Sequence, residues 1–537
     1  MRQILQSLAD NKWFAPILGM TIGAIIFISV FGFQVVVPTN VDWLLTGGDL
    51  SQHYIGWQFF MQSDWTFPIG VASDLAYPHG LAITFMDSLP LFAIPAKLFA
   101  GVLPDQFQYF GIWGLTSYMA IGLFSALIAR HFTKNPLVIT SVIVLLCFSP
   151  LVFQRMFTHT ALAGQWILLA AIYAALRASA WSLRTNSIIW SILLSVSVMI
   201  HPYFLPMCLF ILVVSCVLRY KAPLRTALDI LVPVVAAIVT TWLIGGFTFT
   251  TISGQKFGGA GYDLASPLLA NGWSVLNLGL PQVRFEMFAY IGLGGLLLIG
   301  AALVTLILQR KALWRRLADH RGKVTSLMVA VILLLIVATG PTISFAGVQL
   351  FAYDVPSFIE KVWGIFRVTA RLAWPLWYGV FVLSIIVLLK FARPRIAAAI
   401  IATACMVQLS DIGFSSQFTQ HTQRFHNIES AQYESQLRNS EWSSIVQGKR
   451  HVVYLGDLYD DRFVNIAQFC IKHNLTLNTG YFARKPTVAI EQTIQNARQD
   501  IMNDAIDADT IYMYDKPIQL GEKYTQTELD GYFVVTR

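Results

Sequence analysis

Residues 15–37 of the chain, APILGMTIGAIIFISVFGFQVVV, contain no charged side chain. A run of about 20 predominantly apolar residues is long enough to cross the hydrocarbon core of a bilayer as an α-helix. No small-residue cleavage site follows this run, so we predict an uncleaved first membrane span and not a secretory signal peptide. The fold is therefore expected to start in a membrane.

Similar apolar runs recur as far as residue 410, and composition agrees with them. Of the 537 residues, 56% are hydrophobic and only 12% are charged, about half the charged share of an ordinary soluble protein. We predict an α-helical polytopic membrane protein with about eleven transmembrane helices. The predicted spans are 15–37, 107–129, 136–153, 160–178, 186–203, 204–218, 226–246, 287–308, 325–345, 373–391 and 396–410.

Basic residues predict the orientation, because cytoplasmic loops hold an excess of Lys and Arg. Loops on one side of the predicted spans carry clusters such as Arg310-Lys311 and Arg315-Arg316, whereas the opposite loops are mainly acidic. We therefore predict a membrane protein with a cytoplasmic N-terminus and, from the odd span number, a periplasmic C-terminus. The net charge of +8 is then a topology signal, and no nucleic-acid partner is predicted.

Three predicted periplasmic loops, 38–106, 247–286 and 346–372, are too long to be simple connectors. In the first loop, Leu50, Tyr54 and Trp57 recur at helical spacing with polar residues between them. This pattern predicts an amphipathic helix lying on the membrane surface, in contact with lipids. The second loop is rich in Gly and aromatic residues, as at 255–259.

The composition changes after residue 410 to that of a soluble domain of ordinary size. We divide the chain into a transmembrane domain, residues 1–410, and a small periplasmic α/β domain, residues 411–537. Hydrophobic periodicity predicts strands at 451–456, 510–514 and 532–536 and helices at 461–473 and 487–504. This domain carries no Gly-rich nucleotide-binding fingerprint, which favours a scaffold or acceptor-docking role.

Two carboxylates in the first loop are candidates for catalysis. Asp49 follows Gly47-Gly48, where the backbone can turn before a helix begins. A partly desolvated carboxylate at a membrane surface can act as a general base on an acceptor hydroxyl. His53 is expected on the same helix face, close enough to orient Asp49 or share its proton. Asp87 is the second candidate, and a helix cap is the alternative interpretation of both carboxylates.

Arginine and histidine side chains gather at the predicted outer ends of the spans. Arg155 and His159 are one helical turn apart, as are Arg367 and Arg371, and His201 lies at another outer edge. Guanidinium groups can grip a phosphate bidentately, although snorkelling to the interface is an alternative. Nucleotide sugars are made inside the cell, so a transferase on the outer face needs a lipid-linked donor.

This arrangement resembles the GT-C superfamily of membrane glycosyltransferases, in which a catalytic Asp in the first outer loop precedes a surface helix. The stretches GDLSQHYIGW (48–57) and MDSLPL (86–91) resemble an uncharacterised bacterial GT-C-like family. The surroundings of Arg155, Glu286–Gly292 and Phe366–Trp374 fit that family too.

The residue pattern and the resemblance together predict a role for each candidate residue. Asp49 would be the base, assisted by His53 and Asp87. Arg155, Arg367 and Arg371 would hold the phosphate of a polyprenyl-phosphate sugar. The substrate cavity would be lined by Trp57, His159, His201 and Glu286. Gly48 stands where several GT-C enzymes carry a second acid, which leaves metal dependence open. No Cys/His spacing of the structural-zinc kind is present, so no metal ligand is predicted.

The leading hypothesis is a glycosyltransferase that moves a sugar from a polyprenyl-phosphate donor to an envelope glycan, lipid or protein. A carrier or flippase of lipid-linked sugars is one alternative, for which charges along a path through the spans are expected. The inner halves of the predicted spans are nearly free of charges. A non-catalytic membrane scaffold is the other alternative, but it would not need the cluster of Asp, Arg and His side chains.

Overall fold

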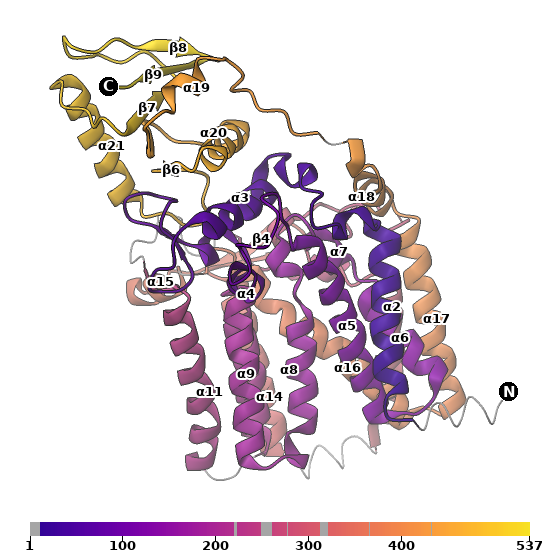
Figure 1. The fold of residues 1–537 in the computed structure, drawn as a ribbon. Coiled ribbons are helices and arrows are strands. Elements are labelled where there is room, and N and C mark those ends of the chain that lie inside the picture. Colours follow the sequence, from indigo (N-terminus) through magenta and orange to yellow (C-terminus); the bar gives the residue numbers. More distant parts are fainter. Residues whose placement is uncertain are drawn as a thin grey trace.

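The computed structural model describes residues 11–219, 223–248, 260–276, 278–311, 321–364, 366–430 and 432–537. A layer of long helices forms one part of the molecule, and a smaller domain containing a sheet lies against one of its faces (Figure 1). We refer to that face of the helical layer as the domain side. The predicted Gly- and aromatic-rich segment 255–259 lies outside the described residues.

Nine helical segments within the described residues are long and apolar enough to cross a membrane. They are α2 (Phe14–Phe31), α5 (Phe110–Phe132), α6 with α7 (Pro136–Arg155), η4 with α8 and η5 (Thr160–Ala180), α9 (Leu183–Ile200), α11 (Pro223–Leu243), α14 (Arg321–Thr339), η8 with α16 (Thr369–Phe391) and α17 (Pro394–Gly413). Each falls in a predicted span. The other two predicted spans contain the shorter apolar helices α10 (Phe204–Arg219) and α12 (Leu293–Leu308). The set is compatible with a polytopic membrane protein.

Helices α2 and α5 approach each other closely because glycines face each other at their contact. A Cβ atom added to Gly122 would lie 1.9 Å from the carbonyl oxygen of Gly19, and one added to Gly23 would lie 2.1 Å from that of Tyr118. Small residues let the backbones of membrane helices approach one another, which increases their dispersion contacts. The glycines of the first span therefore fix its place in the helical layer.

Replacing Gly122 with Ala is expected to destabilise the protein by about 1–3 kcal/mol, because the helices must separate to admit the methyl group. Thermal unfolding in detergent measures this change. Gly300→Ala in α12 is the matched control, since no atom lies within 4 Å of its added Cβ. An unfolding temperature of Gly122→Ala equal to that of the control would contradict the account of this contact.

The first loop contains the predicted helix, α3 (Gly48–Gln62), but its side chains do not face lipid and water as an amphipathic surface helix would. Every side chain from Leu50 to Phe60 is buried. The polar face is covered by the C-terminal domain, where Gln468 donates to the side chain of Gln58 at 2.6 Å. Polar residues in the middle of this helix, such as Gln58, therefore contact other protein groups, whereas Asp49 and Gln52 line a cavity.

The remaining loops on the domain side carry short elements. The first loop continues with β1 (Val71–Ala72), β2 (Leu81–Ala82) and α4 (Pro90–Lys97), and the third contains β3 (Thr342–Phe345), β4 (Val348–Ala352) and α15 (Ser357–Trp363). Helix α18 (Ser416–His426) follows α17 and leads toward the C-terminal domain. Helix α4 is too short to span, as the sequence predicted.

The C-terminal domain has the predicted α/β architecture. Its five-stranded sheet has the order β6-β5-β7-β9-β8, in which β6, β5 and β7 are parallel and β9 is antiparallel to both of its neighbours. The elements are β5 (His451–Tyr454), α20 (Asp460–Lys472), β6 (Thr476–Leu477), α21 (Thr487–Met502), β7 (Thr510–Tyr514), β8 (Thr527–Leu529) and β9 (Tyr532–Val535). The predicted strands and helices are confirmed, whereas β6 and β8 were not predicted.

The edge strand β6 pairs with the first loop. The Leu477 amide donates to the Asp74 carbonyl at 2.8 Å, and the Tyr77 amide donates to the Leu477 carbonyl at 3.1 Å. An open sheet edge exposes unpaired backbone groups, and these bonds satisfy them. The domain is thus fastened to the loop that carries Asp49 and Asp87.

Candidate functional site

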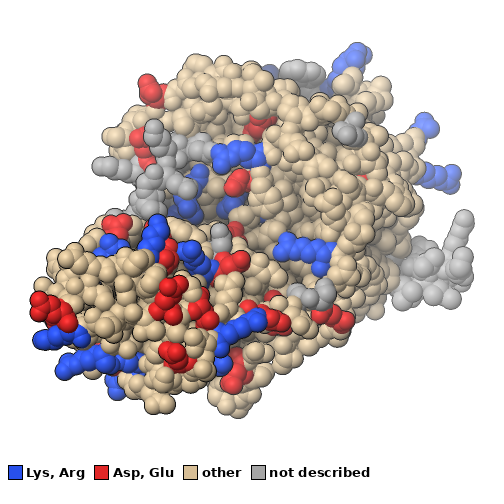
Figure 2. Space-filling model, turned by 90° about the horizontal axis from the view of Figure 1, so that it is seen from above, with Lys and Arg blue, Asp and Glu red and all other residues tan. Residues whose placement is uncertain are grey.

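A cavity of about 580 Å³ lies between the domain side of the helical layer and the C-terminal domain. Its polar lining residues are Asp49, Gln52, Thr84, Asp87, His159, His201, Tyr203, Thr241, Glu286, Arg367, Arg371, Tyr481 and Arg484. Seen from above, acidic and basic side chains gather in a hollow beside the C-terminal domain (Figure 2). Most of the predicted site residues, which come from distant parts of the chain, therefore meet in one place.

Asp49 lies in the first turn of α3. Gly47 and Gly48 have φ angles of 91° and 65°, a conformation that residues with a Cβ rarely adopt, and the helix starts directly after this turn. The partial positive charge of a helix N-terminus stabilises a carboxylate in this position. No side chain caps α3, so Asp49 does not have the alternative role of helix cap.

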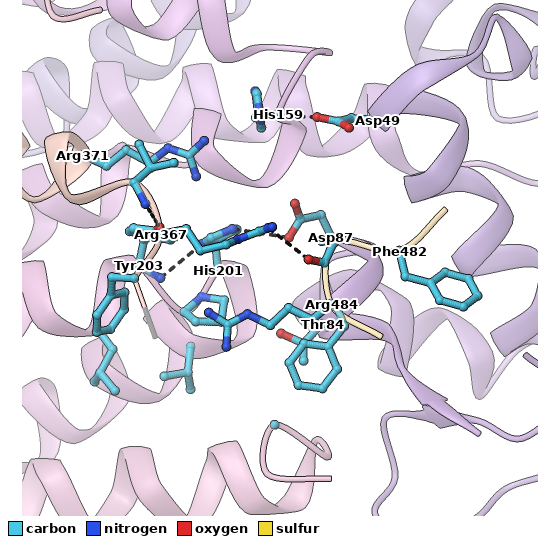
Figure 3. Close-up of a pocket in the computed structure, with 18 of the residues that line it drawn as sticks. Asp49, Thr84, Asp87, His159, His201, Tyr203, Arg367, Arg371, Phe482 and Arg484 are labelled. Carbon is cyan, nitrogen blue, oxygen red and sulfur yellow. Dashed lines mark hydrogen bonds and ion pairs between the residues drawn. The ribbon is translucent and has the colours of Figure 1, made fainter. Parts of the chain in front are cut away.

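The Asp49 carboxylate has two side-chain partners. The Tyr481 hydroxyl donates to Oδ1 at 2.8 Å, and His159 Nε2 lies 3.3 Å from Oδ2. The predicted partner His53 instead lies with its Nε2 3.9 Å from Asp87 Oδ2 and does not line the cavity. The prediction that His53 orients Asp49 is therefore wrong, and His159 takes this place (Figure 3).

Asp87 is held in place by contacts between the two sequence stretches quoted above. Its φ of 52° is in the left-handed region. The next residue, Ser88, donates its hydroxyl hydrogen to the His53 carbonyl at 2.7 Å, and its own carbonyl accepts from Tyr109. Gly56 permits this approach, because an added Cβ would lie 2.5 Å from Ser88 Oγ. Helix α4 starts after Leu89 without a side-chain cap, so Asp87 is not a helix cap either.

The environment of Asp87 changes its ionisation. Its Oδ1 lies 3.4 Å from His201 Nε2. The pKa of Asp87 is raised to about 7, mainly by burial and also by the charge of Asp49, while the charges of nearby arginines, Arg371 foremost, oppose the rise. Burial lowers the pKa of His201 well below its usual value, and nearby arginines add to this effect. At neutral pH, Asp87 is therefore present in both protonation states beside a neutral imidazole.

Arg367 and Arg371 both line the cavity, as predicted, but they do not share a helix. Arg371 lies in the 3₁₀ helix η8 (Thr369–Ala373), and Arg367 precedes it. Arg371 is 6% exposed as a residue, and its guanidinium carbon lies 5.1 Å from the ring centre of Tyr203. Its Nε has no hydrogen-bond partner among the residues that the structure describes. Arg371 is therefore suited to an anionic ligand.

Two predicted site residues lie elsewhere. Arg155 is fully buried behind the cavity, where its Nη2 donates to the carbonyls of Phe285 at 2.8 Å and Glu286 at 3.2 Å. It supports the turn that carries the Glu286 side chain to the cavity. Trp57 is also fully buried, and its indole donates to the Phe107 carbonyl at 2.9 Å. Arg155 and Trp57 therefore do not line the cavity, contrary to the prediction for Trp57, whereas His159, His201 and Glu286 line it as predicted.

The C-terminal domain contributes cavity residues that the sequence analysis missed. Tyr481, Phe482, Ala483 and Arg484 follow β6 and form one wall of the cavity. One sequence signal could have indicated this wall: two aromatic residues and Arg484 lie close together between Gly480 and Pro486. Within the described residues, no group of three or more His, Cys, Asp or Glu side chains could hold a metal ion.

The cavity predicts a pH effect on the binding of an anion. Below about pH 7 Asp87 is neutral, and above it the ionised carboxylate repels an anion and competes for Arg371. Burial lowers the pKa of His53 to about 4 and that of His159 well below its usual value, so neither imidazole titrates in this range.

We therefore expect the affinity for a phosphodiester lipid to fall at least about fivefold between roughly pH 6 and pH 8, as for two like charges in a hydrated site. Titration calorimetry with a polyprenyl-phosphate hexose measures this change. The phosphodiester itself stays singly charged across the range. Asp87→Asn should remove the pH dependence, and its persistence in that variant would contradict the assignment.

The fold is compatible with a multi-pass membrane protein, and an α/β domain closes a polar cavity at one face of its helical layer. The chain belongs to the family described as a domain of unknown function, DUF6311, whose model matches residues 20–413. The model of the DUF6311 C-terminal domain matches residues 441–537. No curated protein and no solved structure matches the chain. Both matched regions contribute residues to the cavity.

Proposed function

We propose that this protein is a glycosyltransferase that uses a polyprenyl-phosphate-linked sugar on the periplasmic face of a bacterial inner membrane. The acceptor is a hydroxyl group of an envelope glycan, lipid or protein. One observation carries the proposal: a cavity at the end of the helical layer brings the carboxylates Asp49 and Asp87 together with the buried guanidinium of Arg371.

An apolar groove beside the cavity supports a lipid-linked donor. It has a volume of about 400 Å³ and is lined by side chains of α10 and α14, among them Phe210, Val214 and Leu334, and by Phe366 and Leu372. Phe366 lines both the groove and the polar cavity, and Arg371 precedes Leu372 in the chain. A polyprenyl tail in the groove would thus place its phosphate near Arg371.

Each side chain of the site has a separate role in the proposed reaction. The acceptor hydroxyl attacks the anomeric carbon of the donor sugar and loses its proton to the Asp49 carboxylate. The bond between the anomeric carbon and the phosphate oxygen breaks, and polyprenyl phosphate leaves with the bonding electrons. Arg371 stabilises the charge that develops on this leaving group. Tyr481 and His159 hold the Asp49 carboxylate in one orientation.

Mass analysis of envelope glycans tests the proposed function in cells. Cells that express the parent protein are compared with cells that lack it and with cells that express Asp49→Asn. We expect one sugar modification to be present only with the parent protein. A modification that persists at full level in the Asp49→Asn cells would contradict a catalytic role, and a loss of lipid-linked sugar from the periplasmic leaflet would indicate a carrier.

A further inference from the structure

The segment 481–484 connects the C-terminal domain to both halves of the candidate site. The Tyr481 hydroxyl donates to Asp49, and the Ala483 amide donates to the Phe85 carbonyl at 3.1 Å. From the other side, Arg367 Nη2 donates to the Ala483 carbonyl at 3.0 Å. The segment is therefore bonded to the first loop and to the third loop at once.

Arg484, at the end of this segment, shares the cavity with Arg371. Both cations lower the pKa of Asp87 and of His201 by their charge, so the two guanidinium groups lie around the same polar space. In the view of Figure 3, Arg371 and Arg484 lie on opposite sides of the Asp87–His201 pair. Arg371 belongs to the transmembrane domain and Arg484 to the C-terminal domain.

Part of the Arg367 guanidinium is already bonded to the Ala483 carbonyl. Arg371 is more than nine-tenths buried, and its Nε lacks a hydrogen-bond partner among the described residues. A buried guanidinium of this kind has a strong preference for an anion. An anion that contacts two guanidinium groups at once would satisfy this preference.

We propose that Arg371 and Arg484 bind the same donor phosphate from two sides, so that donor binding holds the C-terminal domain against the transmembrane domain. The proposal rests on the proposed function and specifies how its donor is held. A ligand that contacts both domains binds the docked state more tightly than the undocked state, and by linkage it stabilises docking. The C-terminal domain is then part of the donor site and not only a platform for an acceptor.

The first test measures the affinity of the full-length protein in nanodiscs for polyprenyl phosphate. Arg371→Gln and Arg484→Gln are each expected to weaken binding by about 10- to 100-fold, as for the loss of a charge-assisted hydrogen bond. Lys485→Gln is the matched control, because Lys485 pairs with Asp457 at 2.7 Å and lies outside the cavity. Arg484→Lys keeps the charge and should weaken binding less than Arg484→Gln. If Arg484→Gln does not fold, the affinity of Arg484→Lys still tests the proposal.

The second test measures domain docking by hydrogen exchange. In the parent protein, polyprenyl phosphate is expected to slow exchange of the Ala483 and Leu477 amides, which donate across the domain interface. In Arg484→Gln the same concentration should leave their exchange unchanged.

The outcomes separate this proposal from the proposed function. Equal affinities of the parent and Arg484→Gln, or exchange in the parent that does not respond to saturating lipid, would overturn the shared phosphate site. Binding and exchange as expected, with no sugar transfer, would overturn the glycosyltransferase and leave the phosphate site intact. No binding of polyprenyl phosphate by the parent would overturn both.

Discussion

Replacing Asp49 with Asn is expected to lower the rate of sugar transfer by about 10²–10⁴-fold, the usual contribution of a general base. The Asn side chain has the same shape and can still accept the hydrogen bond from the Tyr481 hydroxyl. What it lacks is the carboxylate that receives the proton of the acceptor hydroxyl. Turnover of the purified variant and its thermal unfolding should be measured together.

Asp105→Asn is the matched control for this prediction, because Asp105 belongs to the same loop, is exposed and does not line the cavity. It should transfer sugar at the parent rate. Near-normal turnover by a folded Asp49→Asn variant would remove Asp49 from the role of base. Asp87, the other carboxylate of the cavity, would then take its place.

The second large effect is expected from a residue that does not line the cavity. Replacing Gly56 with Ala places a Cβ 2.5 Å from Ser88 Oγ and 2.6 Å from Met86 Cβ, so the turn that carries Asp87 must move. A displacement of about 1 Å can lower a rate by roughly 100-fold. We expect a loss of transfer of this size while the apolar helices still form.

Gly379→Ala in α16 is the control for Gly56→Ala, since its added Cβ meets no atom within 4 Å. Circular dichroism should show the parent helix content in both variants. Full activity of Gly56→Ala would show that the turn carrying Asp87 tolerates the displacement. The contact between stretches 48–57 and 86–91 would then not be needed for activity.

Much of the fold could be predicted because its signals are local. An apolar run such as 15–37 identifies a membrane helix without knowledge of its neighbours, and the elements of the C-terminal domain follow from periodicity. Asp49, Arg367 and Arg371 lie near the outer ends of predicted spans. This position alone predicts that all three lie at the same face of the helical layer. That prediction is confirmed, because all three line one cavity.

The failures involve partners that are distant in the sequence. Helical spacing suggested His53 as the partner of Asp49, but His159 reaches Asp49 from the turn after α7. The Tyr481 hydroxyl lies 432 residues along the chain from its acceptor Asp49. Local patterns carry no information on such a pairing.

The buried face of α3 was missed for a related reason. Polar residues such as Gln58 and Gln62 satisfy the pattern of a helix that faces water. The same residues can equally bond to a second polar surface, and here they bond to side-chain and backbone groups of α20. An amphipathic pattern indicates which face is polar, but it does not identify what covers that face.

The most direct test of the central claim is sugar transfer by the purified protein in proteoliposomes. A polyprenyl-phosphate sugar with a labelled hexose is supplied on the side of the C-terminal domain together with an envelope extract as acceptor. We predict the release of polyprenyl phosphate in step with the transfer of label to the acceptor, both lost in Asp49→Asn and Arg371→Gln. Transfer at the same rate in those two folded variants, or binding of the donor with no release of polyprenyl phosphate by the parent protein, would contradict the account.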